Sequence, residues 1–150
     1  MKNKYFITLA LWLATHSVLA VPLLEKITTP GFVMAEYAIS KSCVIHRTGS
    51  LVINRNLGQL SSTRTIALKL NLPTISSVIK TAALGSITTG IAPVDGGRVE
   101  YHAYQLQANG SLKKVVLWED GEGSSNINNT MEAKMLRNFI DLTCGDPLLY

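Results

Sequence analysis

Two cysteines constrain this sequence more than any other feature. Cys43 and Cys144 are the only cysteines among its 150 residues, and most of the chain lies between them. In an exported chain the simplest interpretation of such a pair is one disulfide. The bond would close a loop of about 100 residues and hold an early strand hairpin against the last helix. A reactive or metal-binding thiol is disfavoured, because neither cysteine has a second Cys or a series of His near it in the sequence.

Residues 1–20 predict export. Lys2 and Lys4 form a basic start, residues 6–14 an apolar run, and residues 18–20 a small-residue cleavage site. The apolar run is shorter than the roughly 20 residues of a membrane span. We expect a cleaved signal peptide that leaves residues 21–150 as a single secreted or periplasmic domain, without stable membrane insertion. The alternative is an uncleaved N-terminal anchor.

The composition narrows the classes of partner. With 47% hydrophobic and 16% charged residues, the chain is expected to form a packed core rather than a disordered segment. It has 14 Lys and Arg against 10 Asp and Glu, but two of the basic residues lie in the signal. The others are scattered, and no basic run exceeds Lys113-Lys114. Binding to nucleic acid or to an anionic membrane surface requires clustered Lys and Arg, so we expect neither partner.

Turn residues divide the first half of the sequence into strands. Residues 32–45 are rich in β-branched and aromatic side chains, and residues 47–49 (Arg-Thr-Gly) interrupt the pattern. A three-residue loop with Gly49 in the left-handed region predicts a hairpin that sets Ile45 opposite Leu51. Residues 63–70 alternate well enough to predict a further strand.

Two segments predict helices. Aliphatic side chains recur at helical spacing over residues 74–84, and Gly85 ends this pattern. A second helix is expected over residues 130–143. Its expected N-cap is Asn129, with Glu132 three residues later.

These elements together define the expected fold class. Residues 108–110 (Ala-Asn-Gly) predict a second hairpin, with Leu106 opposite Leu112. We expect an α+β fold: an antiparallel sheet built from two hairpins, with two helices packed on one face. Superimposing residues 49–51 on residues 110–112, both Gly-Ser-Leu, also aligns the two helices. This match indicates a tandem β-β-α repeat, with chance as the alternative.

Two mature histidines raise the question of catalysis. His46 and His102 fall near equivalent positions of the two hairpins. The sequence contains no G-x-S-x-G turn, no Cys–His pair with an orienting amide and no Walker-type glycine loop. We therefore expect no enzyme, no catalytic residue and no cofactor. The alternative is a small hydrolase that uses His102 with Glu100 or Glu119 as an acid–base pair.

A polar, Gly-rich stretch over residues 119–128 places oxygen-bearing side chains at every second position. Ca²⁺ needs six to eight oxygen ligands, which such a loop partly supplies. Ser125, however, stands where an EF-hand loop needs Gly, and Met131 where it needs a bidentate Glu. We expect a solvated connector without a metal, and a Ca²⁺-stabilised envelope or secreted protein is the alternative. The residues concerned are Asp120, Glu122, Ser124, Asn126 and Asn128.

An apolar connector provides the expected binding surface. Residues 86–97 carry no charge before Asp95, and long apolar loops in compact domains are often binding elements. We expect a non-enzymatic, inhibitor-like module that binds another protein, since a preorganised loop lowers the entropic cost of binding. The alternative is that Ile87, Ile91 and Val94 fold back as a short strand or core edge, and that the aromatic residues beside them belong to the core. The expected contacts are Ile87, Ile91, Pro93, Val94 and Trp118.

Overall fold

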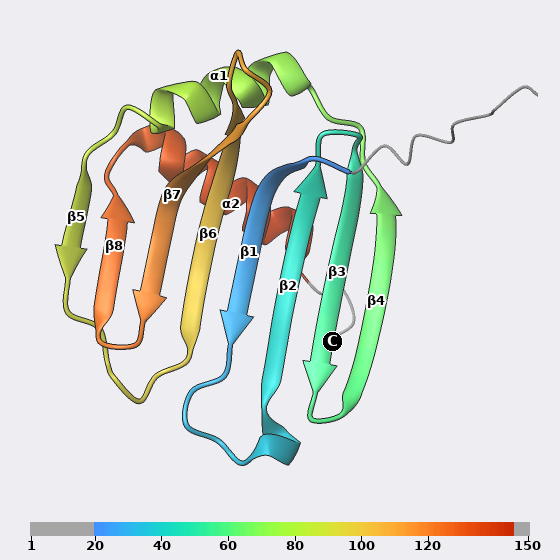
Figure 1. Cartoon of the computed structure of the whole chain (residues 1–150), viewed down its shortest axis with the longest axis vertical. Coiled ribbons are helices and arrows are strands. Elements are labelled where there is room, and N and C mark those ends of the chain that lie inside the picture. Colours follow the sequence, from blue (N-terminus) through green and yellow to red (C-terminus); the bar gives the residue numbers. More distant parts are fainter. Residues whose placement is uncertain (1–19, 146–150) are drawn as a thin grey trace, which may run out of the picture.

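The computed structural model describes residues 20–145 and shows one antiparallel sheet with two α-helices (Figure 1). The expected signal peptide lies outside the described residues apart from Ala20, as do residues 146–150. In chain order the elements are β1 (Pro22–Thr29), the 3₁₀ helix η1 (Ala35–Tyr37), β2 (Ile39–His46), β3 (Ser50–Leu57), β4 (Leu60–Ala67), α1 (Leu72–Ala82), β5 (Ile87–Gly90), β6 (Arg98–Leu106), β7 (Leu112–Gly121), β8 (Ser124–Asn128) and α2 (Met131–Cys144).

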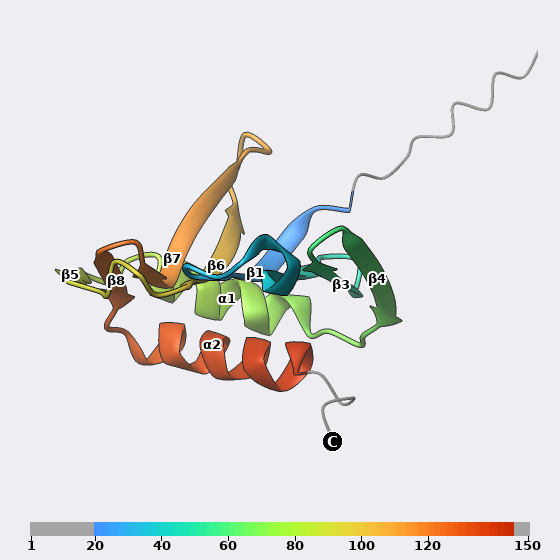
Figure 2. The same ribbon diagram turned by 90° about the horizontal axis from the view of Figure 1, so that it is seen from below.

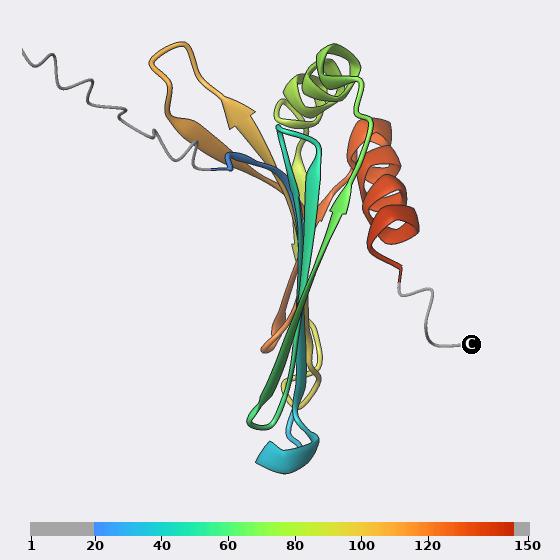
Figure 3. The ribbon, with the colours of Figure 1, turned by 90° about the vertical axis from the view of Figure 1, so that its right-hand side faces the viewer.

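The sheet has eight strands in the order β4-β3-β2-β1-β6-β7-β8-β5. Every neighbouring pair is antiparallel. Both helices pack on one face, and no helix of the described chain covers the other face (Figures 2 and 3). The α+β class and the two helices on one face are thus confirmed. Neither helix is long and apolar enough to cross a membrane.

The core lies between the sheet and the helices. It combines aliphatic side chains of the central strands with the inner sides of α1 and α2. The expected disulfide is present: Cys43 on β2 is bonded to Cys144 at the end of α2, with their Cα atoms 6.0 Å apart. Side chains exposed by 1% or less include Leu24, Ile45, Leu51, Ile79, Leu117 and Ile140.

Both expected turns are present in the expected register. Ile45 pairs with Leu51, and Leu106 pairs with Leu112. Gly49 and Gly110 have φ angles of 82° and 81°, which residues with a Cβ rarely adopt. Local turn chemistry therefore determined these parts of the sheet.

The helix boundaries differ slightly from the expected ones. α1 begins two residues earlier than predicted, with Asn71 as its N-cap. Asn129 is not the N-cap of α2. Thr130 has that role, because its hydroxyl accepts a hydrogen bond from Ala133 N at 3.1 Å. The Asn129 amide instead donates to Thr88 Oγ1 on β5 at 2.6 Å.

The predicted sheet of two hairpins is smaller than the observed sheet of eight strands. Four strands, rather than two, precede each helix, so β-β-α is not the repeating unit. The sequence does not predict β1 or β8, whereas β5 is the short strand given as the alternative for the 86–97 connector. The stretch at 119–128 is not a solvated connector but the hairpin of β7 and β8. The predicted strand at 32–45 begins only at Ile39, and the one at 63–70 is β4. All residues of β5 are exposed and β8 is largely polar, so neither shows the apolar alternation that predicts a strand.

Candidate functional site

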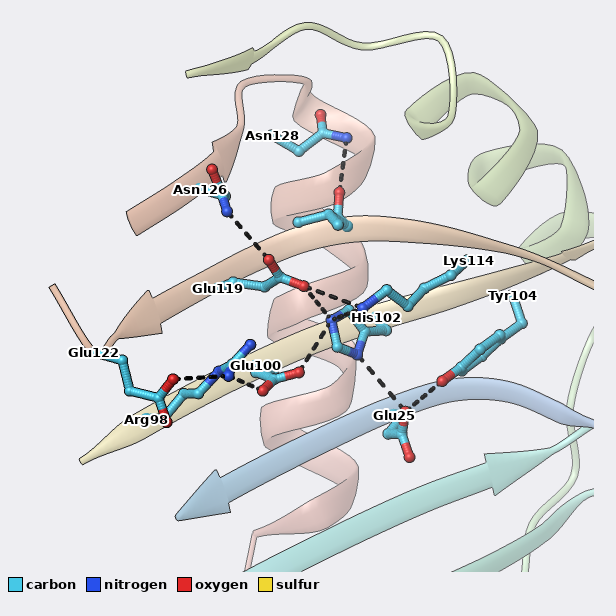
Figure 4. Close-up of polar contacts among 11 residues, drawn as sticks. Glu25, Arg98, Glu100, His102, Tyr104, Lys114, Glu119, Glu122, Asn126 and Asn128 are labelled. Carbon is cyan, nitrogen blue, oxygen red and sulfur yellow. Dashed lines mark hydrogen bonds and ion pairs between the residues drawn. The ribbon is translucent and has the colours of Figure 1, made fainter. Parts of the chain in front are cut away.

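A cluster of charged side chains lies on the face of the sheet that the helices leave open (Figure 4). Lys26 and Tyr101 both contact Asp141 of α2, at 2.5 Å and 2.7 Å, so these side chains point toward the helices. Successive residues of a strand point to opposite faces, which directs Glu25 and His102 to the open face. We call the following residues the His102 cluster: Glu25, Glu100, His102, Tyr104, Lys114 and Glu119.

A β-bulge brings Glu119 into this cluster. His102 pairs with Val116, but Tyr101 pairs with Trp118, so Leu117 is an extra residue on β7. Without that extra residue Glu119 would be turned to the helix face, because a shift of one residue reverses every side chain. With it, Leu117 is completely buried and Glu119 stands beside Glu100 on the open face.

His102 is the centre of the cluster. Its side chain is only 2% exposed. Nε2 lies 2.8 Å from Glu119 Oε1 and 3.4 Å from Glu100 Oε2, whereas Nδ1 faces Glu25 Oε2 at 3.6 Å. The Lys114 ammonium lies 3.3 Å from both His102 Nε2 and Glu119 Oε1. The imidazole is thus surrounded by three carboxylates and one cation.

Further contacts hold each carboxylate in place. The Tyr104 hydroxyl donates to Glu25 Oε2 at 2.5 Å. The Asn126 amide donates to Glu119 Oε2 at 3.2 Å, and Arg98 Nε lies 2.5 Å from Glu100 Oε1. In Glu100 and Glu119, therefore, one oxygen is held by an outer partner while the other points toward His102 Nε2.

The cluster shifts the pKa of its members. Burial alone would lower the pKa of His102, but Glu25 and Glu119 outweigh it, and the pKa is raised. The pKa of Glu25 is lowered, chiefly by His102. Burial would raise the pKa of Glu119, but its bonds with His102, Asn126 and Lys114 lower it overall. Burial and Glu25 raise the pKa of Tyr104.

These shifts predict a stability maximum in mildly acidic solution. His102 contributes fully below its unfolded pKa of 6.5, and the contribution is lost as the pH rises through the raised folded pKa. Glu25 and Glu119 contribute fully above 4.5, and their contribution is lost as the pH falls through the lowered folded values. The cluster should therefore stabilise the chain most between pH 4.5 and 6.5.

Urea unfolding at a series of pH values, with a chelator present, measures this profile. Glu25→Gln should flatten both sides of the maximum, because it removes a partner of His102 and the Glu25 titration itself. Glu36→Gln, a change of the same kind on η1, should leave the profile unchanged. A profile that Glu25→Gln leaves as it is would show that the cluster does not couple protonation to folding.

The cluster can act chemically in two ways. Glu100, His102 and Glu119 could hold a metal ion, since their ligand atoms all lie within 4.8 Å of one another. His102 and Glu119 also form the acid–base pair that the hydrolase alternative requires. The His102 side chain is almost completely buried, however. A substrate would therefore contact Lys114 and the carboxylates before the imidazole.

The residues of the expected calcium loop are largely engaged elsewhere. They lie along β7, its turn and β8 rather than around one point of a loop. Glu122 pairs with Arg98 at 3.2 Å, and Asn126 donates to Glu119. Asn128 is buried and donates to the carbonyls of Ala82 and Val116.

The expected protein-binding residues separate into two groups. Ile91 and Val94 are 95% and 76% exposed, and Pro93 between them is also exposed, whereas Ile87 is exposed at the opposite end of β5. Trp118 is not part of this surface. It stacks on the buried Tyr101 with ring centroids 5.6 Å apart and lies under Arg137 of α2. The aromatic pair thus belongs to the packing between sheet and helix.

Further loops with exposed apolar side chains, which the sequence alone does not predict to be a binding surface, lie at the same end of the sheet as the loop of Ile91 and Val94 (Figure 1). We call this region the loop end and define it as residues 30–38, 58–60 and 91–97. The loops touch: Phe32 N donates to Asp95 O at 3.4 Å, and Gly58 N donates to Ala38 O at 3.3 Å. Its most exposed additional members are Phe32, Met34, Tyr37 and Leu60.

Comparison with known proteins assigns neither the His102 cluster nor the loop end. No protein-family model matches the chain. No curated protein matches its sequence.

Proposed function

We propose that this protein is an exported, non-enzymatic module that binds another protein through the loop end. The observation that supports this function most strongly is the gathering of exposed apolar side chains from three separate loops. Phe32 is 98% exposed, Ile91 95% and Leu60 74%. Exposed apolar side chains that gather at one end of a fold are typical of protein interaction sites.

The shape of the loop end suits a partner's side chains. An open cavity of about 620 Å³ lies between η1 and the turn from β3 to β4. The sheet also extends past both helices toward this end, so neither helix obstructs an approaching protein (Figure 3). The cavity is lined by Ala35, Glu36, Leu57, Gly58, Gln59 and Leu60.

The loops are held in place before a partner arrives. A Cβ atom on Gly31 would lie 2.6 Å from Asp95 O and 2.8 Å from Gly97 N, so the two backbones pack closely there. Ala92, near the start of the third loop, is buried, with 5% of its surface exposed. Preorganised loops lose less conformational entropy on binding, which favours affinity.

A capture experiment with matched variants tests this function. The oxidised chain is immobilised and exposed to envelope and culture-supernatant extracts, and retained proteins are quantified by mass spectrometry. The test variant is Phe32→Ser/Ile91→Ser. The control is Leu84→Ser/Leu142→Ser. Leu84, in the segment that follows α1, is 83% exposed, and Leu142, in α2, is 86% exposed.

We expect a partner that the wild type and the control retain and that the loop-end variant binds at least about tenfold more weakly. Exposed aromatic and aliphatic anchors dominate interface energies, so removing two should have this effect. Circular dichroism should show the same fold for all three chains. Equal retention by both variants would reject the loop end as the binding surface.

A further inference from the structure

We propose that Glu100, His102 and Glu119 form a binding site for a divalent transition-metal ion of the Zn²⁺ type. The site lies on the open face of the sheet and is separate from the loop end. The three residues contribute one nitrogen and two oxygens from the neighbouring strands β6 and β7. An imidazole with two carboxylates is a ligand set that Zn²⁺ accepts, leaving one position for water.

The distances suit coordination. Zn²⁺ binds nitrogen and oxygen ligands at about 2.0–2.2 Å, so adjacent ligand atoms of a tetrahedral site are about 3.4 Å apart. His102 Nε2 lies 3.4 Å from Glu100 Oε2 and 2.8 Å from Glu119 Oε1. Only small side-chain movements are needed to place an ion between them.

Each proposed ligand already has an outer partner that orients it (Figure 4). Arg98 holds the second oxygen of Glu100, and Asn126 holds the second oxygen of Glu119. Glu25 lies on the Nδ1 side of His102. Metal-bound histidines usually donate their other ring N–H to a carboxylate, and such outer contacts raise affinity.

The orientation of the His102 ring is compatible with metal binding at Nε2, because Nδ1 faces Glu25. Its Nδ1 atom is buried and has no hydrogen-bond partner, although the side chain is 2% exposed. An unpaired buried polar atom is costly. Binding of an ion at Nε2 would leave the proton on Nδ1, where a short movement toward Glu25 Oε2 completes the missing hydrogen bond.

When no metal ion is bound, the Lys114 ammonium lies beside the proposed position of the ion. The ammonium lies 3.3 Å from both His102 Nε2 and Glu119 Oε1, next to the space that the ion would enter. The Lys114 side chain is 51% exposed, so it can turn out to solvent. We infer that Lys114 is an internal competitor that the ion displaces.

Zn²⁺ titration by calorimetry tests the site, using the untagged, oxidised chain after treatment with a chelator. The ligand variants are Glu100→Gln and Glu119→Gln, which preserve side-chain shape. Asp120→Asn is the matched control, because it removes a neighbouring carboxylate that points to the opposite face. Lys114→Met removes the competing charge and keeps the aliphatic stem. The absorption spectrum of added Co²⁺ reports the coordination geometry independently.

We expect one Zn²⁺ per chain and a tetrahedral Co²⁺ spectrum. Loss of an outer partner of a metal ligand typically lowers affinity about 10- to 100-fold, and each ligand variant should lower Zn²⁺ affinity by at least that much. The affinity of Asp120→Asn should stay within about twofold of wild type. Lys114→Met should bind Zn²⁺ more tightly. The site is overturned if the wild type binds no Zn²⁺ or if Asp120→Asn weakens binding as much as Glu119→Gln. Weaker binding by Lys114→Met would overturn the competitor role.

Discussion

Replacing both cysteines by alanine should lower the free energy of unfolding by about 4–5 kcal/mol. The disulfide closes a loop with a sequence separation of 101 residues. Cross-linking so long a loop removes much of the conformational freedom of the unfolded chain, which the chain-entropy model values at about 4.7 kcal/mol. The bond also joins β2 in the sheet to the end of α2, so its loss should free the helix that covers the core.

Urea unfolding of three samples measures this effect: the oxidised wild type, the reduced wild type and Cys43→Ala/Cys144→Ala. Alanine is preferable to serine because both cysteines are buried, at 2% and 5% exposure, and a buried hydroxyl would add its own cost. The reduced wild type should resemble the variant. A loss smaller than about 1 kcal/mol in both would show that the unfolded chain gains little freedom when the bond is absent.

Local signals account for the parts of the fold that the sequence predicted. The turns at Gly49 and Gly110 require positive φ, and the residues around them set the strand register. Both helices have a clear apolar periodicity. The cysteine pairing followed from there being only two candidates.

The unpredicted strands depend on the rest of the sheet. β5 is four residues long with every residue exposed, and β8 is largely polar, so neither has a hydrophobic pattern of its own. β1 lies at the centre of the sheet, but its alternation is irregular, because a register shift falls between Pro22 and Leu24. These segments become strands because a neighbouring strand supplies hydrogen-bond partners for their backbones.

The candidate site, too, depends partly on features that no local sequence signal predicts. From the sequence, His102, Glu100 and Glu119 form only an alternative site, because no catalytic motif supports them. Pairing of adjacent strands alone does not place Glu119 on the same side of the sheet as the other two. The bulge at Leu117 does so, and no local pattern marks it. Glu25 comes from a strand that was not predicted at all.

The loop end was predicted in part. Ile91, Pro93 and Val94 were selected because apolar residues in a connector are conspicuous. Phe32 was assigned to a strand instead, because its neighbours are also β-branched and aromatic. The chain there forms η1 and a loop, where Phe32 has no strand beside it to pack against.

Asn128→Ala should destabilise the chain by about 3 kcal/mol, the second largest effect that we expect. Asn128 is 2% exposed and ends β8. Its amide donates to Ala82 O at 2.9 Å and to Val116 O at 3.1 Å, while its carbonyl oxygen accepts from the backbone N–H and hydroxyl of Thr130. One side chain thus links the end of α1, the strand β7 beside the bulge and the N-cap of α2.

Alanine would take away the acceptor of the Thr130 N–H and one donor each from the Ala82 and Val116 carbonyls, although Ala82 O keeps its bond from Gly85 N. Each buried group left unsatisfied costs about 1–3 kcal/mol. The matched control is Asn129→Ala, which removes an exposed amide that bonds only to Thr88 in the described contacts and should cost less than about 1 kcal/mol. Urea unfolding of both variants gives the difference, and hydrogen exchange should show faster opening of α1 and α2 in Asn128→Ala alone. If the two variants lost equal stability, the link between the helices would have to come from apolar packing instead of from the buried amide.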